Sequence, residues 1–177
     1  SAKKLFWKFG IKKVTIEEIA RTAGVSKMTI YRSFKNKQEI AEILITKLYD
    51  EGFERFQNIM NQKKSFESKI IEIIKMESEN TQDMSETLLS DLLKNNKGLH
   101  DLVEKFQQNS IQLVVDYFII AQKNNELREE ISPELIKYLM NNLLVKLSDK
   151  DYIHLFKTPQ QAVVESVKLL FYGISIH

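Results

Sequence analysis

The 177-residue chain contains no cysteine, two prolines and five glycines. Without thiols it can form no disulfide, no thiolate metal site and no cysteine nucleophile, and a reducing compartment suits it. The scarcity of proline and glycine, with no low-complexity stretch, argues against a flexible hinge between independent domains. No apolar run approaches the roughly 20 residues that span a bilayer, and no secretory signal precedes the first motif. These absences predict a cytoplasmic protein of one large or two small domains.

Sequence signatures of catalysis are missing as well. The three histidines, His100, His154 and His177, are too scattered to suggest a metal site, and His100 beside Asp101 is expected to be a solvated pair. There is no glycine-rich phosphate loop, nucleophile elbow or zinc-protease pattern. We therefore expect neither enzyme activity nor a metal or cofactor.

The most informative stretch covers residues 14–37, VTIEEIARTAGVSKMTIYRSFKNK. Gly24 ends a first helix there, because a residue without Cβ adopts the left-handed conformation of a helix C-terminus at little cost. Two short helices joined by a three-residue turn predict a helix-turn-helix. Three helix N-caps support this reading: Thr15 in a capping box with Glu18, Ser26, and Asn36 with Glu39 as its reciprocal partner.

The second of these helices has a polar, basic face. Its side chains offer donors for phosphate oxygens and for base edges in the major groove. Residues 1–47 contain 11 Lys or Arg against 4 Asp or Glu, a balance of +7 in a chain of net charge +2. A basic head on an acidic body is typical of a protein that presents one end to a polyanion. In the alternative, the three-helix corner never touches DNA and these residues are ordinary solvated surface.

A set of residues in the first 50 positions follows one known pattern without gaps: Leu5, Phe6, Gly10, Thr15, Ile19, Ala20, Ala23, Gly24, Val25, Ser26, Thr29, Ile30, Tyr31, Phe34 and Lys37. This pattern resembles the N-terminal domain of the tetracycline-repressor (TetR) family. The resemblance implies that Tyr31 and Lys37 hold DNA phosphates, with help from Thr15 and Thr29. The remaining face of the second helix would meet bases or nearby backbone. The expected DNA-binding residues are Thr15, Ser26, Lys27, Met28, Thr29, Tyr31, Arg32, Ser33 and Lys37.

The rest of the chain is predicted to be helical, which makes the expected fold class all-α. Apolar residues recur at three- and four-residue spacing, and Pro133 and Pro159 each fit the first position of a helix. A second, shorter resemblance to the family covers residues 121–134. We expect a DNA-binding domain at residues 1–47 and a ligand-binding and dimerisation domain at residues 48–177. The expected helices cover residues 37–60, 66–80, 82–95, 98–124, 133–148 and 159–175.

The last two helices are apolar over much of their circumference, so they must be covered on more than one side. They could be plain core helices. The resemblance implies instead a two-fold, four-helix interface, and two-fold pairing is also what the reading of a palindromic site requires. The expected dimer residues are Leu143, Leu147, Val163, Val167, Leu170, Phe171 and Ile174.

A small-molecule pocket is expected in the body. Methionine and aromatic residues at helical spacing are usually plain core, but uncharged polar groups beside apolar faces can orient a ligand. No acidic cluster faces the apolar stripes, which argues against a polycationic ligand and favours a small apolar or amphipathic effector. The expected ligand-binding residues are Met76, Met84, Phe106, Gln107, Ser110, Tyr117, Phe118, Asn141 and Asn142.

The favoured function is a homodimeric, ligand-responsive regulator that binds a palindromic operator in double-stranded DNA; repression is the family's commonest mode. The alternative is a DNA-bound structural or interaction protein whose body recruits a protein partner and has no small-molecule inducer. An apolar cavity with a few polar groups would favour the first, and a fully packed body the second. An enzyme on a helical scaffold is the least favoured hypothesis.

Overall fold

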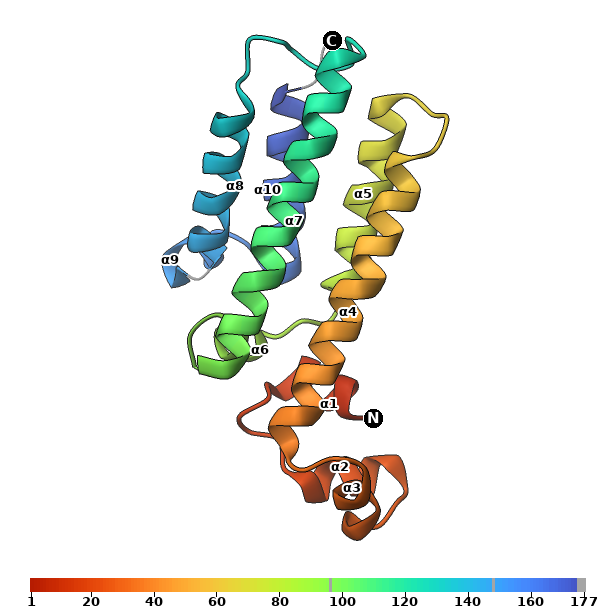
Figure 1. Cartoon of the computed structure of the whole chain (residues 1–177). Helices are drawn as coiled ribbons and strands as arrows, with labels where there is room; N and C mark the ends of the chain where they lie inside the picture. The colour runs from red at the N-terminus through yellow and green to blue at the C-terminus, as the bar shows by residue number, and fades with distance from the viewer. Residues whose placement is uncertain (96, 148, 175–177) are drawn as a thin grey trace.

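The computed structural model describes residues 1–95, 97–147 and 149–174, and every regular element in these ranges is helical (Figure 1). The all-α fold expected from the sequence is confirmed. None of the described helices is both long and apolar enough to cross a membrane. The elements are α1 (Ala2–Phe9), α2 (Ile16–Ala23), α3 (Lys27–Ser33), α4 (Lys37–Met60), α5 (Phe66–Asn80), α6 (Glu86–Ser90), the π-helical turn η1 (Asp91–Asn95), α7 (Lys97–Lys123), α8 (Pro133–Leu147), α9 (Lys150–Ile153) and α10 (Pro159–Ile174).

The helix α4 is the spine of the molecule. It begins in the helix-turn-helix formed by α2 and α3 and runs to the far end of the body (Figure 1). Along the way it packs against α5 and α7, while α8 lies against α7 and α10 lies against α5 and α8. A displacement of its body end would therefore be transmitted to the helix-turn-helix at its other end.

Most helix boundaries agree with the sequence, but the helix expected at residues 82–95 begins only at Glu86 and becomes π-helical at Asp91. The chain first makes a turn in which Asp83 has a φ of +59°, and α6 begins only at Glu86. Ser85 caps it by accepting a hydrogen bond from the Leu88 N–H at 3.2 Å. After one turn and a half the helix passes into η1. The short helix α9 was not expected at all, since four residues carry no periodic signal.

The head and the body share one hydrophobic core. Phe6 and Trp7 of α1 are buried together with Leu88 of α6, Leu92 of η1 and Leu99 of α7. The main chains also meet, because the Ser85 N–H donates to the Trp7 carbonyl at 3.0 Å. The packed unit thus crosses the expected domain boundary at residue 47. A second core fills the body between α4, α5, α7, α8 and α10.

Candidate DNA-binding face and ligand cavity

The local signals that start and stop the helix-turn-helix are formed as the sequence predicts. The Thr15 hydroxyl accepts from the Glu18 N–H at 3.2 Å, and the Glu18 carboxylate accepts from the Thr15 N–H at 2.8 Å. These hydrogen bonds hold the pKa of Glu18 below its ordinary value, the backbone bond from Thr15 contributing most. Gly24 adopts the left-handed conformation, with φ 69° and ψ 28°. The capping box and the glycine stop are both confirmed.

The third cap differs from the expectation in one partner. The Asn36 side chain accepts from the Glu39 N–H at 2.9 Å, as predicted. The Glu39 carboxylate, however, accepts from the Lys35 N–H at 2.5 Å instead of the Asn36 N–H. A side chain in the first turn reaches either of the two amides before it, and sequence spacing alone does not choose between them.

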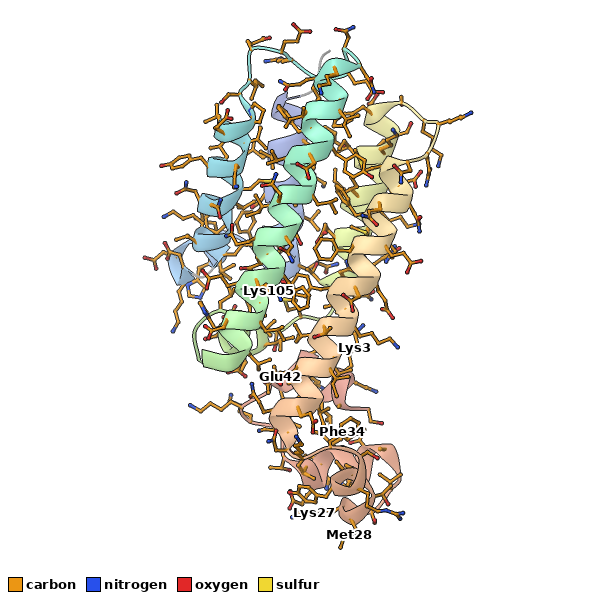
Figure 2. All side chains as sticks on the ribbon, in the orientation of Figure 1. Lys3, Lys27, Met28, Phe34, Glu42 and Lys105 are labelled. Atoms are coloured by element: carbon orange, nitrogen blue, oxygen red, sulfur yellow. The ribbon has the colours of Figure 1, made fainter. Side chains whose placement is uncertain are left out.

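The helix α3 presents its polar face to solvent. Met28 is 70% exposed and Tyr31 47%, and Arg32 and Ser33 are exposed beside them. Only Ile30 of this helix is buried. Lys27 and Met28 lie at the end of the molecule that is farthest from the body (Figure 2). An exposed, basic, seven-residue helix at the tip of the molecule has the position and composition to enter a major groove.

Several of the expected DNA-binding side chains are already engaged within the head. The Ser26 hydroxyl accepts from the Thr29 N–H at 3.0 Å and also bonds the Thr29 hydroxyl at 2.9 Å. The Lys27 ammonium pairs with the Glu17 carboxylate of α2, whose hydrogen bond raises the pKa of Lys27. In the part of the chain that the structure describes, Arg32 and Tyr31 donate no hydrogen bond. They are the side chains most available to DNA.

Lys37 anchors the loop between α1 and α2. Its ammonium donates to the carbonyl oxygens of Lys12 at 2.9 Å and of Val14 at 2.5 Å. Partial burial lowers the pKa of Lys37, although Asp91 and Glu18 oppose this. An ammonium has three donors, so one remains for a phosphate oxygen. The loop also carries the exposed basic residues Lys12 and Lys13, which the sequence reasoning did not select.

A buried carboxylate joins this loop to the body. Asp91, at the start of η1, is 3% exposed and accepts from the Lys12 N–H at 3.0 Å. Gly10 makes the close approach possible: it has a φ of +81°, and a Cβ there would stand 2.5 Å from the Thr87 methyl group and 2.7 Å from the Asp91 carboxylate. The sequence marked Gly10 only as part of the family pattern. The contact with Asp91 depends on residues 79 positions apart, so no local signal announces it.

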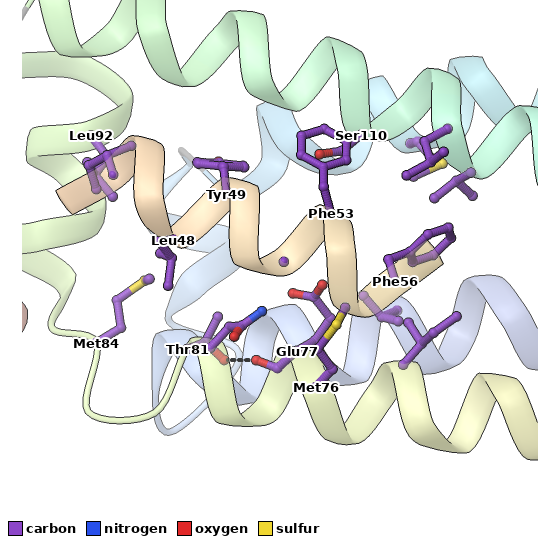
Figure 3. A pocket seen from close by; sticks show the side chains of 18 of the residues that line it. Leu48, Tyr49, Phe53, Phe56, Met76, Glu77, Thr81, Met84, Leu92 and Ser110 are labelled. Atoms are coloured by element: carbon purple, nitrogen blue, oxygen red, sulfur yellow. Dashed lines mark hydrogen bonds between the residues drawn. The ribbon is translucent and has the colours of Figure 1, made fainter. Parts of the chain in front are cut away.

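The body encloses a cavity of about 280 Å³ between α4, α5, α7 and α10 (Figure 3). Apolar side chains and aromatic rings make up most of its wall. Gly52 opens it on the α4 side, since a Cβ there would still be 3.9 Å from the Asn80 amide. Trp7 of α1 in the head also lines the cavity. The volume lies just below the range of roughly 300–1,000 Å³ that is usual for ligand pockets.

The polar groups of the cavity differ in how they are satisfied. The Thr81 hydroxyl donates to the Glu77 carbonyl at 2.7 Å, and the Ser110 hydroxyl donates to the Phe106 carbonyl at 3.0 Å. The Glu77 carboxylate points from α5 toward α4, into the cavity (Figure 3). Burial raises the pKa of Glu77 to about 6, with Arg55 acting against the rise. Burial, and next the charge of Glu77, also raise the pKa of Tyr49.

The structure brings together three of the expected ligand-binding residues: Met76, Met84 and Ser110 line the cavity. Phe106 lies behind the wall, stacked on Tyr49 with ring centroids 4.8 Å apart. The others do not line it. Tyr117, Phe118, Gln107, Asn141 and Asn142 stand elsewhere on α7 and α8; Tyr117 donates to Asn61, while Asn141 and Asn142 donate back to their own helix. Glu77, Tyr49, Asn80 and Trp7 were missed, because a glutamate or tryptophan in an amphipathic stretch gives no sign that it faces a cavity.

The residues expected at a dimer interface lie largely within the protomer. Leu147 and Phe171 are buried, and Leu143, Val163, Val167 and Leu170 are half-buried, the last two packed on the body core. The side chain of Ile174 lies outside the described residues. The apolar residues that α8 and α10 do expose are Leu135, Tyr138, Leu139, Val145, Leu169 and Tyr172. Both helices therefore keep exposed apolar residues besides the predicted ones, which stay a prediction.

One surface cluster has metal-ligand atoms within reach of one another. The ligand atoms of His100, Asp101 and Glu104 lie within 4.8 Å on the first turns of α7. The three side chains are largely exposed, and His100 pairs with Asp101 at 3.7 Å. This arrangement fits the solvated pair expected from the sequence, and no buried group supports a metal there.

Residues 1–44 match the family model described as bacterial regulatory proteins, tetR family. The chain is 23% identical over 150 residues to the uncharacterized HTH-type transcriptional regulator YhgD of Bacillus subtilis (strain 168), covering 83% of this chain and 78% of that protein. Its fold is similar to that of the fatty acid degradation regulator FadR from Bacillus halodurans, with a TM-score of 0.72, 19% identity and coverage of 97% and 91% of the two chains. A transcriptional regulator from Saccharomonospora viridis, solved in complex with choline, gives a TM-score of 0.73 at 16% identity, covering 99% and 94%.

The resemblance found in the N-terminal residues is therefore confirmed, and it extends to the fold of the body. The helix-turn-helix within residues 1–44 matches the tetR family of bacterial regulatory proteins, and the fold of the whole chain is similar to that of solved transcriptional regulators. Regulators of this family bind DNA, often together with a ligand and as dimers, and are not typically enzymes.

Proposed function

We propose that the protein is a homodimeric, ligand-responsive repressor that binds a palindromic operator through α3. The observation that carries the proposal is the position of Trp7. This residue belongs to α1 of the head, yet it lines the cavity of the body. A ligand in the cavity therefore touches the head directly.

The coupling route consists of three contacts at the junction. Trp7 accepts the hydrogen bond of Ser85 ahead of α6, and Leu92 of η1 lines the cavity one residue after Asp91. Asp91 in turn accepts from the Lys12 N–H, and the Lys12 carbonyl oxygen accepts from the Lys37 ammonium. A ligand that displaces Trp7 or Leu92 would move this chain of contacts and, with it, the distance between the two recognition helices of a dimer. Because linkage is reciprocal, such a ligand binds less tightly to the DNA complex.

Homodimerisation is supported by the outer face of α8 and α10. Tyr138 is 65% exposed, Val145 67% and Leu169 78%. Large apolar side chains grouped on neighbouring helices usually mark an interaction surface. A second copy covers this face with two-fold symmetry, and the pair then addresses two half-sites.

The first experiment is an electrophoretic mobility shift on the DNA that flanks the protein's own gene, with sedimentation of the free protein alongside. A sequence-specific shift by a dimer is expected. Tyr31→Phe should weaken binding to every sequence by about tenfold, because it removes a hydrogen bond to a charged phosphate oxygen. Tyr117→Phe is the matched control: it removes a hydroxyl from the body, where Tyr117 donates to Asn61, and should leave DNA binding unchanged.

Lys37 provides an independent check on phosphate binding. Lys37→Ala should make the slope of log affinity against log salt shallower by about 1. An unchanged slope would leave Lys37 as a loop anchor only. No specific shift by a folded dimer on any flanking fragment would favour the alternative, a body that recruits a protein partner. The cavity supports a ligand-responsive body over that alternative.

A further inference from the structure

The cavity contains one charged residue and nothing that neutralises it. Among the described residues that line it, Glu77 alone carries a charge, and its carboxylate has no hydrogen-bond donor in the part of the chain that the structure describes. The cation whose charge acts on its pKa, the Arg55 guanidinium of α4, is bound to Glu79 at 2.7 Å. A carboxylate in such a place is costly unless a ligand supplies a partner.

The walls around Glu77 suit a cation. Trp7, Tyr49, Phe53 and Phe56 all contribute rings to the cavity. The faces of aromatic rings attract ammonium groups, and more strongly where water is excluded. The Tyr49 hydroxyl and the Asn80 amide add oxygen acceptors to the lining. The rest of the surface is apolar and would cover an alkyl chain or a ring.

We propose that this cavity takes a monocationic amphipathic ligand, with an ammonium or amidinium group held by Glu77 and an apolar portion enclosed by the aromatic wall. This inference rests on the proposed function, since the ligand would be the effector. A single carboxylate matches a single positive charge, in keeping with the absence of an acidic cluster that would hold a polycation. The same carboxylate repels a ligand whose buried group is anionic, such as the head of a fatty acid.

The test compares three eight-carbon ligands whose head groups are cationic, neutral and anionic: octylammonium, octanol and octanoate. Trp7 is the only tryptophan of the chain and lines the cavity, so its fluorescence reports occupancy directly. At pH 8, where Glu77 is ionised, octylammonium should bind the wild-type protein about tenfold more tightly than octanoate or octanol. The same titrations on the operator complex measure release of DNA.

Two variants locate the effect. Glu77→Gln should abolish the preference, so that the affinities for the three ligands converge. Glu79→Gln removes one negative charge from the same helix, on the exposed side that pairs with Arg55, and should leave the preference intact. Thermal unfolding of each variant verifies that it is folded.

Equal or tighter binding of octanoate to the wild type would overturn the inference, and so would a preference for octylammonium that survives in Glu77→Gln. If octanoate or octanol binds and releases DNA as well as octylammonium does, the charge assignment fails while the ligand-responsive function stands. If octylammonium binds through Glu77 and saturating amounts leave the operator complex intact, the assignment stands and the effector role fails.

Discussion

The burial of Glu77 makes a quantitative prediction about stability. Its pKa is about 6 in the folded protein, against an ordinary value of 4.5, because burial disfavours the charged form. A carboxyl group with a raised pKa contributes its full stability below pH 4.5, and that contribution is lost as the pH rises through 6. At 1.36 kcal/mol per unit of pKa, the rise corresponds to a loss of about 2 kcal/mol in the free energy of unfolding at high pH. This is an upper limit, because Glu77 keeps part of its accessible surface.

Replacing Glu77 by glutamine removes this penalty, because the amide stays neutral at every pH. The variant should match the wild type near pH 4.5 and be more stable at pH 8 by about 1–2 kcal/mol, which for a chain of this length raises Tm by roughly 2–8 °C. Circular dichroism melts at pH 5, 6, 7 and 8 and at one protein concentration measure the difference. Fixed concentration is needed because dimerisation also shifts Tm.

The control again is Glu79→Gln. The hydrogen bond from Arg55 lowers the pKa of Glu79, so the ionised form of Glu79 stabilises the fold. Glu79→Gln should therefore be less stable than the wild type at pH 8, and the difference should shrink toward low pH. This change in stability has the opposite sign to that of Glu77→Gln. A Tm difference for Glu77→Gln that is the same at pH 5 and pH 8 would refute the reasoning. So would a loss of stability in that variant at pH 8.

Four further substitutions test the head. Gly10→Ala should lower the free energy of unfolding, measured in urea, by about 2–4 kcal/mol, because a positive φ and the overlap with Thr87 and Asp91 combine. Gly24→Ala should lower it by about 1 kcal/mol, since Gly24 has a φ of +69° but nothing lies within 4 Å of a Cβ there. Equal costs would show that the head-body contact at Gly10 is not tight. Glu17→Gln frees Lys27 and should tighten operator binding in a mobility shift; weaker binding would mean that the ion pair positions α3 for DNA. Arg32→Ala should change sequence preference by about 1–3 kcal/mol at one base pair, and uniform weakening on all sequences would assign Arg32 to the phosphates instead.

The helix starts and the helix-turn-helix could be predicted because their signals are local. A capping box needs two residues three positions apart, as in Thr15 and Glu18, and the positive φ at Gly24 follows from the residue itself. Even so, the Glu39 carboxylate took the amide one residue away from the expected partner. The turn at Asp83 and the π-helical turn after α6 were not foreseen, because they depend on how this segment packs against α1.

The two apolar faces of α8 and α10 show where periodicity stops being informative. Helical spacing groups Val167, Leu170 and Phe171 on one face and Leu169 with Tyr172 on another. Both faces are apolar, so the spacing alone does not decide which of them turns inward. Packing on α5 and α7 makes that choice in the folded chain, and it leaves Leu169 exposed.

The sequence by itself determined the all-helical class, the basic head and the helix-turn-helix, since these follow from local capping, periodicity and charge. Only the tertiary structure decided the site in the body. Glu77 has the sequence context of a surface glutamate, and Trp7 and Gly10 that of a short terminal helix. Their positions matter because α4, α5 and η1 bring residues tens of positions apart into contact. The free-energy cost of burying a charge or a backbone group there depends on neighbours that the order of the chain does not reveal.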